Sequence, residues 1–212
     1  MTANAPPRYK LHWSPKSPFV RKVMITAHEL ELVERLELVR SVASMSGTNP
    51  AIMADNPLNK IPTLVCPDGT PIQDSLVICA FLDDLAGGDH LFPPTGKRRW
   101  RSLSLHALSD GLLDLLILWR NERDKPPERQ TAAWLQALEA KATATLDRCE
   151  QDVAAIATQP LCIGQIALGC ALGYLDFRFP DPGWRKGRSG LSDWFAIFSK
   201  RPSAIATEPA DD

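Results

Sequence analysis

The amino-acid sequence changes character near residue 87, and this change constrains the fold more than any other feature. Before it, short segments of strand character are each interrupted by Pro or Gly. After it come long stretches rich in Leu, Ala, Arg and Glu. Residues 87–97 contain many helix breakers, which is typical of a linker. We therefore predict an α/β domain over residues 1–86, a linker over 87–97 and an all-α domain over 98–212.

The first 86 residues show the order βαβ followed by ββα. Apolar residues at 20, 23, 24 and 27 follow the i, i+3, i+4, i+7 spacing of an amphipathic helix over 18–30. Pro67-Asp68-Gly69 is a turn signature between two short strands. This order predicts a mixed sheet covered by helices. The expected strands lie at 9–13, 35–39, 63–66 and 71–73, and a second helix begins at 74 or 75 and ends near 85.

The remaining residues predict a helical domain built around one buried helix. Cys162–Phe177 is apolar on nearly all sides, as expected for a helix with no exposed face. Amphipathic stripes flank it at 108–119, 134–156 and 191–198. We assign these stripes to the core.

The bulk composition limits the classes of function. The net charge is −1 without a large basic block, which argues against a nucleic-acid partner. No apolar run reaches the ~18 residues of a membrane helix. The first ten residues lack the apolar core of a secretory signal and are expected to form a loose tail. The five cysteines and four histidines show no metal-binding spacing, so we expect free thiols in a reducing cytoplasm and no metal.

The first of three short motifs is Ser17-Pro18. Ser at the cap and Pro at the first helical position are sufficient to explain a helix start. A helix N-terminus also carries roughly +0.5 of a charge, so a hydroxyl there can donate to an anion such as a thiolate. Lowering a thiol pKa from about 8.5 by about two units needs about 2.7 kcal/mol, which one charged hydrogen bond can largely supply. His28 lies about three turns further along the helix, which argues against a serine hydrolase.

The other two motifs can be interpreted in two ways each. Lys60-Ile61-Pro62 is either an ordinary junction before a strand or a cis-proline turn that presents the Ile61 backbone to an extended peptide. In the second case Lys60 meets a carboxylate. Asp74 and Ser75 either cap a helix or bind an α-amino-acid head group, with Asp74 on the ammonium and Ser75 on the carboxylate. Both halves of that head group would then be satisfied.

With these motifs, the sequence resembles the cytosolic glutathione S-transferase family, in particular its bacterial, serine-type, YibF-like members. The resemblance covers nearly the whole chain. It implies an α/β plus all-α architecture, with a thioredoxin-like domain (βαβ-ββα) followed by a helical domain. The matching segments are SPFVRKV, NPLNKIPTL, QDSLVICAFLDDL, GCALGYLDFR and KRPSAIAT.

The resemblance also implies roles for individual residues. Ser17 would hold the glutathione thiolate, and the Ile61 backbone beside a cis Pro62 would pair with the cysteinyl part. Lys60 would approach the glycyl carboxylate, and Asp74-Ser75 would bind the γ-glutamyl head. Glutathione is then a co-substrate, and the family implies a cytoplasmic homodimer. The second substrate, an electrophilic small molecule as in detoxification, would lie between the Trp13–Lys16 loop and the helix containing Asp110, Asp114 and Trp119. The residues expected to contact it are Trp13, Lys16, Phe19, Asp110, Asp114 and Trp119.

The sequence departs from the family pattern at the start of the central helix. The family usually has Ser/Thr-x-x-Asp there, whereas this chain reads Cys162-Ile163-Gly164-Gln165. Cys is a poor acceptor and Gly lowers helix propensity, so we expect a cap weakened by ~0.5–2 kcal/mol. Cys162→Thr or Gln165→Asp should then raise the melting temperature.

Three functions fit these observations. The first is an enzyme that transfers glutathione to an electrophilic carbon, or reduces a peroxide with it. The second is a non-catalytic glutathione-binding or interaction protein that retains the fold. The third is thiol–disulfide exchange by a cysteine of the protein, which is the least favoured because Ser17 occupies the expected position.

Overall fold

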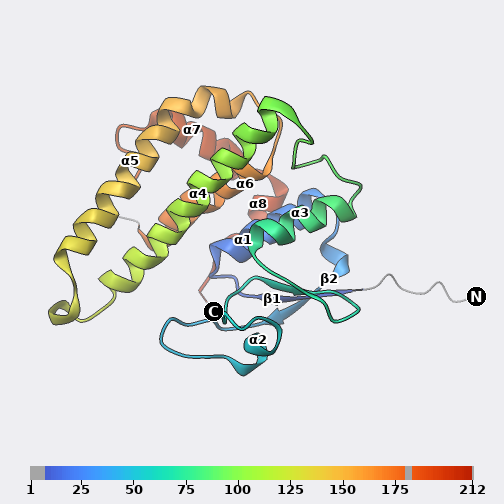
Figure 1. Ribbon diagram of the computed structural model, residues 1–212. Helices are drawn as coiled ribbons and strands as arrows, with labels where there is room; N and C mark the ends of the chain where they lie inside the picture. The colour runs from blue at the N-terminus through green and yellow to red at the C-terminus, as the bar shows by residue number, and fades with distance from the viewer. Residues whose placement is uncertain (1–7, 180–182, 212) are drawn as a thin grey trace, which may run out of the picture. The chain divides into compact units, whose positions relative to one another are not determined.

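The computed structural model describes residues 8–179 and 183–211 of the chain (Figure 1). The chain divides into two compact units. The first contains the residues up to Phe92 together with those from Ala206 onward, and the second is Pro93–Ile205. The last residues therefore group with the first unit, whereas the sequence placed them in the helical domain. Residues 1–7 of the predicted N-terminal tail lie outside the described residues, whereas Tyr9 and Lys10, at its end, belong to the first strand.

Among the described residues of the first unit, four strands form one sheet in the order β2-β1-β3-β4. β1 pairs with β2 in parallel and with β3 antiparallel, and β3 pairs with β4 antiparallel. The predicted mixed sheet is therefore confirmed. The elements are β1 (Tyr9–Trp13), α1 (Pro18–Glu29), η1 (Val33–Arg35), β2 (Leu36–Arg40), α2 (Pro50–Asp55), β3 (Thr63–Val65), β4 (Pro71–Ile72) and α3 (Ser75–Leu85).

The core of the first unit lies between the sheet and the helices α1 and α3, which pack against each other (Figure 1). Leu11 of β1, Val23 of α1 and Ile78 of α3 are fully buried there. α2 lies on the opposite face of the sheet (Figure 1). α2 was not predicted from the sequence, although Asn49-Pro50 repeats the cap-plus-proline signal of Ser17-Pro18.

The second unit is helical, as predicted. α6 is buried along nearly its whole length and packs against α4 and α7, which confirms the central helix. α4 begins at Gly96, inside the predicted linker. The stripe assigned to α5 is wrong at its start, since Trp134 is 59% exposed. The elements are α4 (Gly96–Arg123), η2 (Pro127–Arg129), α5 (Ala132–Ala157), α6 (Ile163–Arg178), α7 (Ser189–Phe198) and α8 (Pro202–Ala206).

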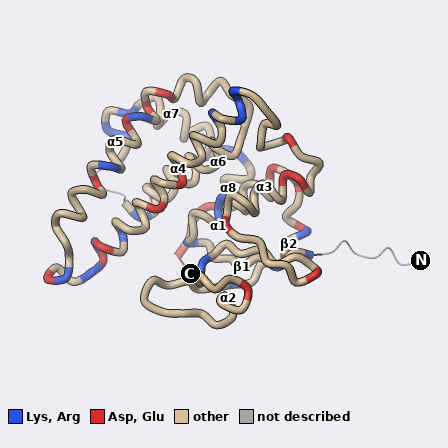
Figure 2. Tube along the Cα trace, in the orientation of Figure 1, with Lys and Arg blue, Asp and Glu red and all other residues tan. Residues whose placement is uncertain are grey.

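α4 differs from expectation in its hydropathy. One 18-residue window of this helix has a mean hydropathy of 1.3 and is, by length and composition, able to cross a membrane. The expectation that no run approaches this length is therefore wrong. The buried part of the window includes Leu112, Leu113 and Leu116, and α4 packs on α5 and α6. The first residues of α4, before this apolar part, include a group of basic side chains (Figure 2).

Helix ends in the second unit are held by carboxylates from neighbouring helices. The buried Glu122 of α4 accepts the backbone N–H of Thr131, the residue before α5, at 2.7 Å. Glu150 of α5 accepts the N–H groups of Gly190 and Leu191 at the start of α7, at 3.0 and 2.6 Å. These bonds satisfy N–H groups that a helix start leaves without intrahelical partners.

The start of α6 corrects two expectations. A Cβ at Gly164 would lie 2.5 Å from the Ser102 carbonyl oxygen of α4, so glycine permits close packing at this point and is not a defect. Gln165 reaches back as expected, because its Oε1 accepts the Cys162 N–H at 3.1 Å. Its Nε2 also donates to the Ile156 carbonyl at 2.7 Å. Aspartate has no such donor, so Gln165→Asp is no longer expected to stabilise the protein.

Candidate functional site

The sheet topology brings the three sequence motifs to one edge of the first unit. β1 and β3 are antiparallel with His12 opposite Thr63, so the end of β1 lies beside the start of β3. β3 and β4 are antiparallel with Leu64 opposite Ile72, so the end of β4 lies at the same edge. The starts of α1 and α3 follow those two strand ends. Ser17, Lys60–Pro62 and Asp74-Ser75 therefore share one edge of the sheet.

Ser17 adopts the cap position that its sequence predicts. Its backbone is extended, and its hydroxyl oxygen accepts the Val20 N–H at 3.3 Å. A hydroxyl has one donor hydrogen and two acceptor lone pairs, and this bond uses a lone pair. The Ser17 proton can therefore still be donated to an anion. Capping and anion stabilisation are compatible functions of the same side chain.

The Asn56–Pro62 loop is organised by a buried amide that the sequence analysis did not single out. Asn56 Oδ1 accepts the Leu58 N–H at 3.0 Å, and its Nδ2 donates to Thr63 Oγ1 at 2.9 Å. The Ile61–Pro62 peptide bond is cis. Among the described residues, none hydrogen-bonds to the N–H or C=O of Ile61. The loop thus presents one backbone segment that an extended ligand can pair with.

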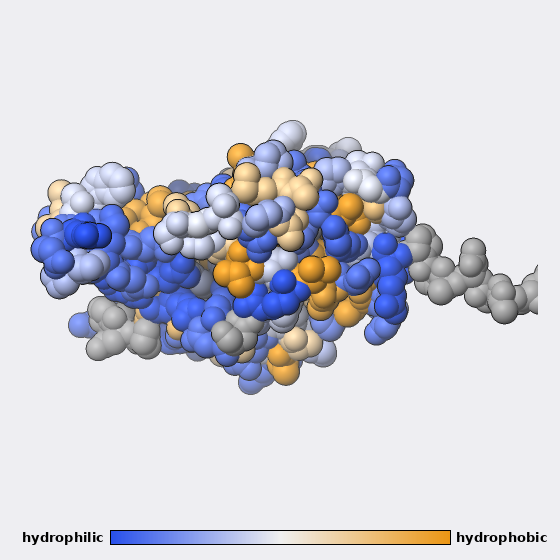
Figure 3. Space-filling view, turned by 90° about the horizontal axis from the view of Figure 1, so that it is seen from below, coloured by the Kyte–Doolittle hydropathy of each residue, from blue (hydrophilic) through white to orange (hydrophobic). Residues whose placement is uncertain are grey.

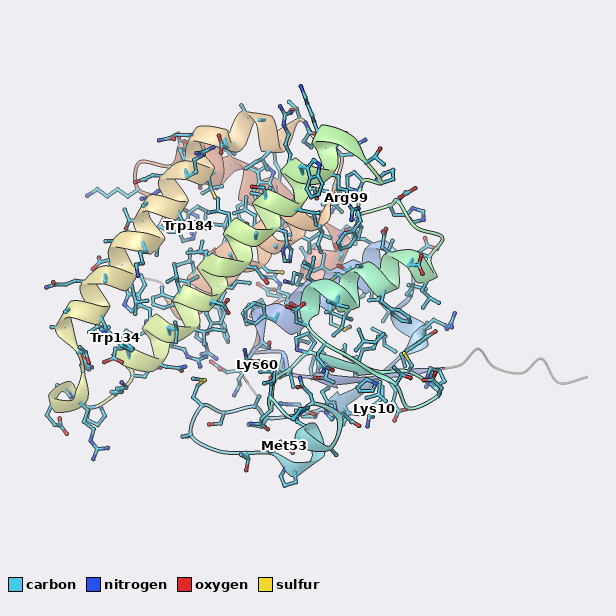
Figure 4. The ribbon with its side chains drawn as sticks, viewed as in Figure 1. Lys10, Met53, Lys60, Arg99, Trp134 and Trp184 are labelled. Atoms are coloured by element: carbon cyan, nitrogen blue, oxygen red, sulfur yellow. The ribbon has the colours of Figure 1, made fainter. Side chains whose placement is uncertain are left out.

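The start of α3 carries the third motif. Asp74 Oδ1 accepts the N–H groups of Leu76 and Val77 at 2.9 and 3.3 Å, so Asp74 is the cap. Its other carboxylate oxygen is available as an acceptor for a cation. Ser75 is the first helical residue and is buried, whereas Asp74 is exposed. Lys60, labelled in Figure 4, is exposed as well. The positive end of the helix and one free carboxylate oxygen therefore lie next to each other.

The residues expected to contact a second substrate from the first unit lie near Ser17 in sequence. Trp13 ends β1 and is half-buried. Lys16 Nζ lies 3.8 Å from Asp211 Oδ1. Phe19 is in the first turn of α1. All three residues lie within four positions of Ser17 in the chain, and their contact with a second substrate stays a prediction.

Two of the three corresponding residues of the second unit, Trp119 and Asp110, have partners inside that unit. The Trp119 ring packs on Phe179 with 5.0 Å between the ring centroids. Asp110 Oδ1 lies 3.9 Å from His106 Nε2. Asp114 is exposed on α4. Packing and pairing within the helical unit therefore account for Trp119 and Asp110, and their predicted contact with a substrate stays a prediction.

The cysteines of the chain do not form disulfides. Burial raises the pKa of the Cys149 thiol to about 11, and burial also raises the pKa of Cys66. Both thiols are therefore protonated at neutral pH, whereas thiol exchange requires a thiolate. This argues against thiol–disulfide exchange by these two cysteines.

In the part of the chain that the structure describes, no group of three or more His, Cys, Asp or Glu is arranged to hold a metal.

Comparisons with known proteins identify relatives over nearly the whole chain. Residues 16–85 match the family described as glutathione S-transferase, N-terminal domain. The chain is 29% identical over 202 residues to the GST-like protein YibF of Escherichia coli (strain K12), covering 94% of this chain and 98% of that protein.

Two solved structures provide a closer comparison. A glutathione transferase family member from Pseudomonas fluorescens Pf-5 with bound glutathione is 40% identical, with a TM-score of 0.92. The match covers 96% of this chain and 100% of that one. A structure from the same organism with bound S-(propanoic acid)-glutathione is 38% identical, with a TM-score of 0.88 and the same coverage.

Proposed function

Because the chain belongs to the glutathione transferase family, we propose that it is an enzyme that binds glutathione and activates its thiol with Ser17. One observation carries this proposal. The starts of α1 and α3 and the Ile61 backbone lie along one edge of the sheet. Their donors and acceptors are complementary to the successive parts of a single extended tripeptide.

Each part of glutathione has a proposed partner at this edge. The cysteinyl backbone pairs with the Ile61 N–H and C=O, as in strand addition. The γ-glutamyl carboxylate binds the Ser75 hydroxyl and N–H at the positive end of α3, and the ammonium binds the free oxygen of Asp74. The exposed Lys60 meets the glycyl carboxylate. These contacts place the thiol beside Ser17.

Ser17 then shifts the ionisation of the bound thiol. Its hydroxyl donates to the sulfur while its oxygen accepts from Val20, which polarises the O–H bond. A hydrogen bond to a charged acceptor is worth ~1.5–3 kcal/mol, and the helix end adds ~0.3–1 kcal/mol. Together these match the ~2.7 kcal/mol that lowers a thiol pKa by about two units.

The thiolate formed in this way is the nucleophile. Its sulfur lone pair forms a bond to an electrophilic carbon of the second substrate, and the electron pair of the broken bond leaves with the departing group. The relative bound to S-(propanoic acid)-glutathione holds a glutathione substituted on its sulfur, which supports carbon rather than peroxide as the acceptor. We propose that Trp13, Lys16, Phe19, Asp110, Asp114 and Trp119 select this substrate.

The role of Ser17 is tested by titrating the ultraviolet absorbance of the bound thiolate. Ser17→Ala should raise the pKa of bound glutathione by about one to two units and lower turnover of an aryl halide about 10- to 100-fold. Ser17→Thr, which retains the hydroxyl, is the matched control and should keep a low pKa. An unchanged pKa in Ser17→Ala would refute the role. Glutathione binding without turnover of any electrophile would favour the non-catalytic binding protein instead.

We further propose a homodimer in the cytoplasm. Large apolar side chains of the first unit, including Val42, Met45 and Leu58, are exposed and available to a second copy. Figure 3 shows apolar patches of this kind among polar residues. Light scattering should give twice the 23.4 kDa mass of the chain, and a mass of one chain would contradict the dimer. The absence of disulfides among the five cysteines supports a reducing compartment.

A further inference from the structure

A chain of polar side chains crosses the face of the sheet on which α2 lies. Lys10 and His12 are two residues apart on β1 and therefore point to the same face. Lys10 Nζ donates to Asp55 Oδ2 at 2.6 Å, and His12 Nε2 lies 2.8 Å from the same oxygen. His12 Nδ1 lies 2.8 Å from Ser41 Oγ, and the Ser41 hydroxyl also donates to the Val39 carbonyl.

The contacts fix how His12 acts on Asp55. A carboxylate only accepts hydrogen bonds, so Nε2 must carry a hydrogen and donate it to Asp55. The hydrogen bonds from Lys10 and then from His12 hold the pKa of Asp55 below its ordinary value. His12 and Ser41 are both almost completely buried, so water does not replace these bonds readily.

Asp55 is the last residue of α2, and Asn56 follows it directly. Asn56 holds the loop by hydrogen bonds to the Leu58 N–H, to Thr63 Oγ1 and, at 3.4 Å, to the Lys60 carbonyl. Asp55, which is held by Lys10 and His12, is therefore joined by one peptide bond to Asn56, the residue that organises the loop containing Ile61. Figure 4 shows Lys10 on the same side of the sheet as α2 and its residue Met53.

Apolar packing of α2 is confined to one side chain. Of the six residues of α2, all of which are described, Ile52 alone is buried. A helix of this length is not stable on its own. The position of α2, and of the loop that follows it, therefore depends on Ile52, on the polar bonds of Asp55 and on the cap residue Asn49, whose N–H donates to Asn59 Oδ1 at 2.9 Å.

We propose that His12 is a positioning residue for glutathione binding, acting through Asp55 and Asn56 to hold the Ile61 backbone in place. This inference rests on the function proposed above. The hydrogen-bonded side chains of Lys10, His12, Ser41 and Asp55 form a relay that leads to Asn56. Within this relay His12 lies away from the ligand and does not touch the reacting sulfur. Its loss should therefore weaken glutathione binding while the ionisation of bound glutathione, which Ser17 controls, stays the same.

The test compares His12→Leu with His12→Gln, since the Gln amide can still donate to Asp55. His12→Leu should raise the KM for glutathione about tenfold with kcat and the bound-thiol pKa little changed, and His12→Gln should recover most of the affinity. Leu36→Val, a core substitution on β2, controls for lost stability alone and should leave KM unchanged. The double variant His12→Leu/Asp55→Asn should bind no more weakly than the weaker single variant, because both remove one relay.

Hydrogen exchange of the ligand-free protein provides a readout that does not depend on glutathione. The amides of residues 58–61 should exchange faster in His12→Leu than in wild type and in Leu36→Val. If these amides exchanged faster in His12→Leu but the wild-type protein bound no glutathione, the proposed function would be refuted, whereas the role of His12 in positioning the loop would stand. Unchanged exchange and an unchanged KM would overturn this inference, as would a loss of kcat at constant KM.

Discussion

Replacing Gly164 by alanine tests whether α4 and α6 are packed as closely as the structure indicates. A Cβ at this position would lie 2.5 Å from the Ser102 carbonyl oxygen and 2.9 Å from the Leu105 Cβ. The first contact is with backbone, which cannot rotate away, so the two helices must separate. Overpacking of this kind costs ~1–3 kcal/mol, while alanine gains ~0.8–1 kcal/mol in helix propensity over glycine. Because the 2.5 Å contact is with backbone, we take the upper part of this cost, ~2–3 kcal/mol, and the net loss of stability should be about 1–2 kcal/mol.

A thermal melt followed by circular dichroism measures this loss on the full chain. For a chain of this size each kcal/mol shifts the melting temperature by about 2–4 °C, so Gly164→Ala should melt about 2–8 °C lower than wild type. Gly111→Ala is the matched control, because Gly111 lies on α4 with no neighbouring atom within 4 Å of an added Cβ. This variant should melt about 2–4 °C higher. If Gly164→Ala melted as high as the control, the close approach of α4 and α6 would be refuted.

Two further predictions follow from the polar contacts. Cys162→Thr should raise the melting temperature, since a hydroxyl caps α6 better than a thiol by ~0.5–2 kcal/mol. Gln165→Asp should lower the melting temperature, because it removes the hydrogen-bond donors to the Ile156 and Gln159 carbonyls. A Gln165→Asp protein more stable than wild type would contradict these contacts of Gln165 Nε2. Because the pKa of Asp55 is lowered, the folded state binds fewer protons than the unfolded state at pH values near the ordinary pKa of 3.8. The stability that Asp55 contributes is therefore complete above pH 3.8 and is lost as the pH falls through the folded-state pKa. Denaturant titrations between about pH 5 and pH 3 should therefore show a steeper loss of stability in wild type than in Asp55→Asn, and parallel losses would contradict the assignment.

The elements that the sequence predicted well are those whose signals are local. α1 combines a cap, a proline at its first position and an apolar stripe over 12 residues, and it begins at the predicted residue. α2 has the same cap and proline but spans only six residues, less than two turns, so no periodicity could reveal it. Gly164 was interpreted as a weakness of α6 because the carbonyl of Ser102 that requires it is 62 positions earlier in the chain.

The residues of the candidate site also divide into those that local sequence signals reveal and those that they do not. Ser17, Ile61 and Asp74 follow or precede strands, and their meeting at one edge depends only on the order and direction of those strands. The relay beneath them joins residues 29 to 45 positions apart, with nothing in the spacing to indicate it. One local sign existed, because Lys10 and His12 flank the fully buried Leu11 on β1. Polar side chains that alternate with a core residue indicate that the second face of the sheet is polar, and Asp55 of α2 pairs with both of them there.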